Sequence, residues 1–158
     1  MPVMPEPAVP ELAAPERQPD EAVLLAFDFG LKKIGVAVGN TLTRQARPLA
    51  ILRAETRSQR FEGVSRLLAE WQPHRVVVGL PLTLDGGEQD ASRQARRFAH
   101  QLAGRYGLEV LLVDERGSSL EAQALRGRHG DEDDVAAAVI LQRHFDGQGP
   151  ETATERII

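Results

Sequence analysis

The order of its apolar runs constrains the fold of this chain more than any other feature of the sequence. Five runs have the length of a β-strand: residues 22–29, 33–38, 47–53, 75–80 and 109–113. Short links join the first three, which predicts an antiparallel meander. The last two alternate with amphipathic segments, which predicts parallel strands with crossover helices. We therefore expect an α/β fold of order βββαβαβαα, a mixed five-stranded sheet flanked by helices.

Four segments have the apolar spacing or the capping residues of a helix. They begin at Ser58, at Ala91, at Ser118 or Ser119, and at Asp133 or Asp134, and they end near Trp71, Gly104, Leu125 and Phe145. In the loop before the second helix, Asp85 is interpreted as a helix cap in preference to a metal ligand.

The length of 158 residues leaves room for one core, which we place in residues 21–146. Residues 1–20 hold six prolines and four acidic residues and are expected to be a disordered leader. Residues 147–158 are expected to be a flexible tail. No run approaches the roughly 20 apolar residues of a membrane span, and no secretory signal is evident, so we expect a cytoplasmic protein without a membrane partner.

The distribution of charge along the chain changes what the net charge suggests about partners. A net charge of −4 argues against a nucleic-acid partner, but the leader carries most of this excess. Residues 31–60 hold seven basic residues and one acidic residue. This basic region is a candidate surface for a phosphate backbone.

Acidic residues stand where apolar strands end. Asp28 lies near the end of the first strand, inside LLAFDFG, and Asp114 and Glu115 follow the last predicted strand. Because side chains alternate along a strand, only one of the latter two can share a face with Asp28. Hydrogen bonds from turn amides would be a purely structural explanation for Asp28.

The acidic run 131–134 precedes an alanine-rich helix. Its charges suit a helix N-terminus, while the small alanines would let the helix pack closely enough to bring an acid to the strand ends. Three converging carboxylates repel one another unless a cation is bound. The absence of cysteine excludes thiolate ligands, so oxygen ligands for Mg²⁺ or Mn²⁺ are expected. Two such ions about 4 Å apart hydrolyse phosphodiesters in many nucleases.

Four ordered motifs resemble the YqgF family, whose RuvX-like members are RNase H-like proteins described as pre-16S rRNA nucleases or Holliday junction resolvases. The motifs are FDFGLKKIGVAVG (27–39), VVVGLPLTLDG (76–86), VDERGSS (113–119) and DDVAAAVILQ (133–142). The resemblance implies an RNase H-like fold and a two-metal nuclease site with Asp28, Glu115 and one acid before the last helix. Matching that motif selects Asp133 over Asp134, and helical spacing agrees, since Asp133 is in line with Ala137.

The chain departs from the family pattern at four places. Leu31 replaces a frequent threonine, Thr83 replaces a frequent asparagine, and residues 117–119 read Gly-Ser-Ser. The segment 126–132 is shorter and less basic than in relatives, which removes expected phosphate contacts. Lys32, Lys33 and Arg116 remain as candidate contacts to nucleic acid, although solvation of a turn or an ion pair with Asp114 would also explain them.

The sequence thus predicts a metal-dependent endonuclease acting on structured nucleic acid, with maturation of precursor 16S ribosomal RNA as the favoured role. Resolution of Holliday junctions is the alternative. A non-catalytic binding module and an ATPase of the actin or sugar-kinase type are the other hypotheses, and the latter would need a second domain. A monomer or a weak homodimer is expected.

Overall fold

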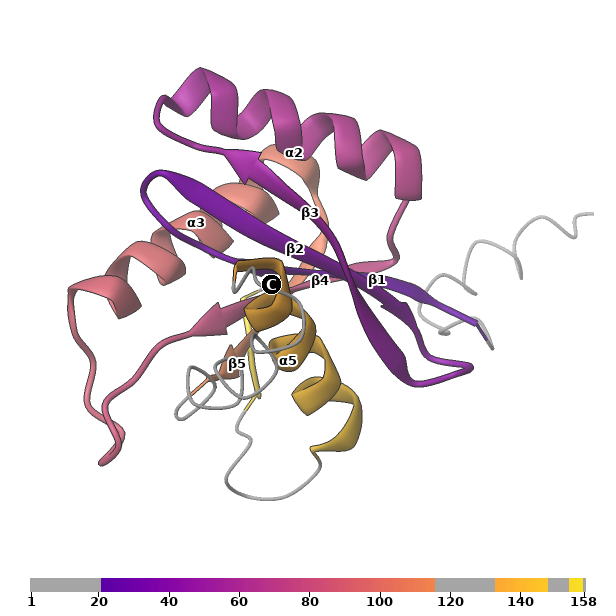
Figure 1. The fold of residues 1–158 in the computed structure, drawn as a ribbon. Helices are drawn as coiled ribbons and strands as arrows, with labels where there is room; N and C mark the ends of the chain where they lie inside the picture. Colours follow the sequence, from indigo (N-terminus) through magenta and orange to yellow (C-terminus); the bar gives the residue numbers. More distant parts are fainter. Residues whose placement is uncertain (1–20, 116–132, 148–153, 158) are drawn as a thin grey trace, which may run out of the picture.

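The computed structural model describes residues 21–115, 133–147 and 154–157, without the side chains of residues 133 and 154–156. The predicted leader, the short helix predicted near 118–125, and Arg116 lie outside the described residues. The described strands form one mixed sheet of six strands in the order β3-β2-β1-β4-β5-β6 (Figure 1). The predicted five-stranded arrangement is confirmed, with one strand added.

The meander comprises β1 (Val23–Asp28), β2 (Lys33–Asn40) and β3 (Gln45–Arg53), which are paired antiparallel. β4 (Arg75–Leu80) pairs parallel with β1, and β5 (Glu109–Asp114) pairs parallel with β4. The carboxyl ends of β1, β4 and β5 therefore meet at one edge of the sheet.

The prediction that 147–158 form a flexible tail is wrong for part of that segment. Thr154–Arg156 form β6, which pairs antiparallel with β5, and the amide of Ile157 donates to the carbonyl of Val110 at 2.9 Å. The edge of β5 offers unpaired backbone groups, so a short polar segment can pair with it even though that segment has no apolar pattern.

Helices cover both faces of the sheet (Figure 1). α2 (Arg57–Trp71) and α3 (Asp90–Tyr106) pack on the face that carries Phe27, Val78 and Leu112. α5 (Asp133–Asp146) packs on the opposite face, over Leu24, Ala26, Val77 and Val113. We call these the α2/α3 face and the α5 face. No helix among the described residues is long and apolar enough to cross a membrane.

The start of α2 differs from the prediction. Thr56, not Ser58, is the N-cap, and it forms a capping box in which its hydroxyl accepts from the Gln59 amide at 3.0 Å. The Gln59 side chain accepts from the Thr56 amide at 3.2 Å in return. The T-x-x-Q pattern satisfies two backbone donors at once, which a cap at Ser58 would not do.

The C-terminal half of α5 is attached to the hairpin between β2 and β3. Gln142 accepts from the Ala46 amide and donates to the Arg44 carbonyl, each at 3.0 Å. Arg44 also donates to the carbonyl of Phe145. A Cβ at Gly39 would lie 2.8 Å from the Phe145 ring, so the glycine permits this close approach of helix to sheet.

Candidate functional site

Strand alternation separates the two acids at the end of β5. Val113 belongs to the α5 face, and Glu115, two residues further on, continues on that side. Asp114 follows Leu112 on the α2/α3 face and is buried, with 3% of its surface exposed. In β1, Leu24 and Ala26 lie under α5, so Asp28 shares the face of Glu115.

The Glu115 carboxylate lies over β4, the strand that separates β5 from β1. A Cβ on Gly79 would lie 2.7 Å from Glu115 Oε1 and 2.5 Å from Ile140 Cδ1. The Glu115 amide donates to the Leu80 carbonyl at 3.1 Å and holds the backbone beside β4. Since adjacent strands are about 4.8 Å apart, the carboxylate above Gly79 is displaced toward the strand that ends in Asp28.

Gly79 is a site residue that the sequence reasoning missed. Its absent side chain creates the space in which the Glu115 carboxylate lies. The glycine that follows three valines in the run VVVGL was the available signal, because glycine inside a buried strand often marks the close approach of another group.

The third predicted acid, Asp133, is the first residue of α5, and its side chain lies outside what the structure describes. The neighbouring Asp134 is half-buried. Across the described ranges, no cluster of three His, Asp or Glu side chains is close enough to hold a metal ion. Asp28 and Glu115 are thus the described part of the predicted site.

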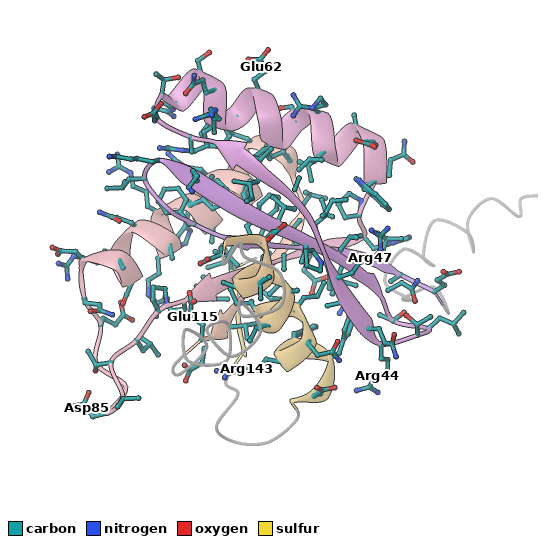
Figure 2. The ribbon with its side chains drawn as sticks, viewed as in Figure 1. Arg44, Arg47, Glu62, Asp85, Glu115 and Arg143 are labelled. Carbon is teal, nitrogen blue, oxygen red and sulfur yellow. The ribbon has the colours of Figure 1, made fainter. Side chains whose placement is uncertain are left out.

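Arg143 of α5 reaches the same end of β5. Its guanidinium donates to the Asp114 carbonyl at 3.2 Å, next in the chain to Glu115. Figure 2 shows Glu115 and Arg143 at this end of the molecule, whereas Asp85 lies at the tip of the loop between β4 and α3. Asp85 accepts from the Gly87 amide at 3.2 Å, and the N-cap of α3 is Gln89, so the predicted capping role of Asp85 is wrong.

The basic region 31–60 is divided between the two ends of the sheet. Lys33 of β2 stands opposite Arg53 of β3 in the strand register, near the carboxyl end of β1. Lys32 is exposed in the preceding turn. Arg44 and Arg47 lie at the opposite end (Figure 2), where the Arg47 guanidinium sits 5.6 Å from the Trp71 ring. Of these two groups, the first lies at the end of the sheet that carries Asp28.

Comparisons with known proteins identify a family across almost the whole described fold. Residues 22–147 match the family described as "RuvX: Holliday junction resolvase". A protein of Bordetella parapertussis named "Putative pre-16S rRNA nuclease" is 70% identical over 126 residues, which cover 80% of this chain and 95% of that protein. A protein of the same name from Paraburkholderia phytofirmans is 53% identical over 131 residues, covering 80% and 90%.

Solved structures support the fold. RuvC of T. thermophilus, determined in complex with a Holliday junction substrate, has a TM-score of 0.51 and 17% identity and covers 84% of this chain and 99% of its own. The fowlpox virus Holliday junction resolvase has a TM-score of 0.50 and 15% identity, covering 78% and 96%. With the strand order of the sheet, these similarities confirm the predicted RNase H-like fold.

Proposed function

Since this chain belongs to the RuvX family of Holliday junction resolvases, we propose that it is a metal-dependent endonuclease whose substrate is precursor 16S ribosomal RNA. The observation that carries the proposal is the shared face of Asp28 and Glu115, with the Glu115 carboxylate over a glycine in the strand between them. The chain is a nuclease, a hydrolase of phosphodiester bonds, and its partner is nucleic acid, as its relatives' names indicate.

The proposed catalytic residues are Asp28, Glu115 and Asp133, acting as ligands for Mg²⁺ or Mn²⁺. The two described donors, Asp28 and Glu115, fit these ions, because they are carboxylates on one face and the space above Gly79 admits the Glu115 carboxylate. Two bound ions would supply an activated water and stabilise the leaving oxygen of the phosphodiester. Lys32, Lys33 and Arg116 are proposed to contact the flanking backbone phosphates.

The packing of α5 supports the assignment of Asp133. Ile140 of α5 lies over Gly79, beside the Glu115 carboxylate, so α5 packs on the face that Asp28 and Glu115 share. Asp133 is the first residue of this helix. Its carboxylate would join the two described acids from the N-terminus of α5.

The choice of ribosomal RNA rests on the relatives that share most of their sequence with this chain. This substrate implies a cytoplasmic site of action. The family description and the RuvC-like fold favour a four-way DNA junction as the second candidate. Symmetric cleavage of a junction would require two active sites, and so a dimer, whereas processing of RNA requires only one.

Asp28→Asn and Glu115→Gln test the proposal. Loss of one ligand charge removes several kcal/mol of transition-state stabilisation, so cleavage of labelled precursor rRNA in Mg²⁺ should fall about a thousandfold. Asp90→Asn and Glu62→Gln are matched controls on exposed helix positions and should retain wild-type rates.

The same assay compares the substrates and the competing functions. Precursor rRNA and a four-way DNA junction are incubated separately in Mg²⁺, in Mn²⁺ and in EDTA. A junction cut faster than the RNA would reverse the choice of substrate. Equal behaviour of wild type and Asp28→Asn on both substrates would remove the nuclease proposal and leave a binding module, and turnover of ATP would favour a phosphotransferase.

A further inference from the structure

A second concentration of positive charge lies on the α2/α3 face, at the same end of the sheet. Arg57 and Arg60 from the first turns of α2 and Arg97 from α3 line a cavity of about 330 Å³. Gln94 and Gln101 of α3 also line it, and Phe29, the residue after Asp28, contributes an aromatic wall. We call the three arginines and this cavity the arginine pocket.

Among the residues that the structure describes, those that line the arginine pocket are basic or uncharged. None of its three arginines forms an ion pair there, and Arg60 Nε is buried without a hydrogen-bond partner. The exposed Glu62 of α2 lies on the side of the helix that faces away from the sheet (Figure 2).

Two contacts hold the guanidinium of Arg60 in place. It lies 5.2 Å from the centre of the Phe29 ring, and its NH2 group donates to the Ala54 carbonyl at 3.4 Å. Burial lowers its pKa, and the charges of Arg57 and Arg97 lower it further. Three cations thus line a cavity that favours an anionic ligand.

We propose that the arginine pocket binds a backbone phosphate of the nucleic acid that the nuclease site cleaves. Guanidinium groups hold phosphate oxygens through paired hydrogen bonds, and the glutamine amides add neutral donors at the rim. The inference rests on the proposed function, because it takes the same molecule as ligand and adds a contact away from the carboxylates.

The position of the arginine pocket fits a strand that passes over the end of the sheet. Asp28 and Phe29 are consecutive but point to opposite faces, and layers packed on a sheet lie about 10 Å from it. A phosphate in the pocket would then lie about 10–15 Å from the Asp28 carboxylate. The pocket would therefore contact the backbone a few nucleotides away from the scissile bond.

The test compares Arg57→Gln/Arg97→Gln with Arg66→Gln/Arg93→Gln, a double variant with the same loss of charge at exposed positions that do not line the pocket. Arg60 is retained because it packs on Phe29. Affinity for a fluorescent precursor rRNA fragment is measured in EDTA over a range of salt concentrations. The first variant should bind about tenfold more weakly, with a salt slope smaller by about 1, and the control should change less than twofold.

Failure of this inference can be distinguished from failure of the proposed function. If both double variants bind equally well while Asp28→Asn abolishes cleavage, the nuclease stands and the arginine pocket is not a phosphate site. If the pocket variant alone loses affinity while Asp28→Asn cleaves normally, the pocket stands and the catalytic residues are wrong. Binding of inorganic phosphate or of a mononucleotide that the pocket variant loses, with RNA affinity unchanged, would overturn the backbone-phosphate assignment.

Discussion

Gly79→Ala tests whether the position of the Glu115 carboxylate matters for catalysis. The new methyl group would lie 2.7 Å from Glu115 Oε1 and 2.5 Å from Ile140 Cδ1. Ordinary contact begins at 3.4 Å, so the carboxylate must move by at least about 0.7 Å and the Ile140 methyl by about 0.9 Å. A displacement of about 1 Å in a catalytic group can lower the rate about a hundredfold.

The clash with Ile140 should affect stability, and the clash with Glu115 should affect the cleavage rate. A second substitution separates the two effects. Ile140 is fully buried, so overpacking against it should lower the free energy of unfolding by about 1–3 kcal/mol. Glu115 ends in a flexible carboxylate that can shift at little cost to stability. Ile140→Val removes the colliding Cδ1 atom, so Gly79→Ala/Ile140→Val should regain much of the stability that Gly79→Ala loses but not its cleavage rate.

The assays are urea unfolding, followed by fluorescence of the single tryptophan, and cleavage of precursor rRNA under saturating protein. Ile140→Val alone is the control: it should lose about 0.5–1.5 kcal/mol of stability and keep its activity. A wild-type cleavage rate in Gly79→Ala/Ile140→Val would refute the reasoning, because it would show that the carboxylate over Gly79 does not have to lie there.

Two further predictions concern stability. Thr56→Ala removes the capping box of α2 and should lower the free energy of unfolding, measured in urea, by about 1 kcal/mol. The control Ser58→Ala should lower it by less than about 0.5 kcal/mol. Equal losses in the two variants would contradict the assigned cap. Burial, with the charges of Arg75 and Arg44, lowers the pKa of His144 below its ordinary value of 6.5. As pH drops through 6.5, the unfolded chain therefore binds a proton before the folded chain does, so the free energy of unfolding falls. In urea titrations, the free energy of unfolding of His144→Gln should depend less on pH than that of the wild type. An unchanged pH dependence would contradict the burial argument.

The parts of the fold that were predicted from the sequence are those with a local physical signal. The five apolar runs became strands, and alternation predicted that Asp114 and Glu115 point to opposite faces, as they do. β6 was missed because three residues that pair with a free strand edge need no apolar pattern. The cap of α2 was misplaced by two residues, although T-x-x-Q carried the necessary signal.

The arginine pocket shows what the sequence could not provide. Arg57 and Arg60 fall in the basic region 31–60, but that region is divided by the sheet, and Arg97 joins them only through the packing of α3 beside α2. A count of charges along the chain does not distinguish arginines that surround one cavity from arginines at opposite ends of a strand. That distinction depends on the tertiary arrangement of the two helices over Phe29.

Formation of the proposed nuclease site depends on the docking of α5. Asp28 ends β1 and Glu115 follows β5, the two strands on either side of β4. Asp133 can join them only when α5 lies across that face. Some of the contacts that hold α5 lie away from the carboxylates: Gln142 and Phe145 are bound to the hairpin between β2 and β3, and Gly39 permits the close approach there. Because a rigid helix transmits position along its length, these contacts would set where its first turn lies. Substitutions at the hairpin should therefore affect cleavage without touching a proposed ligand.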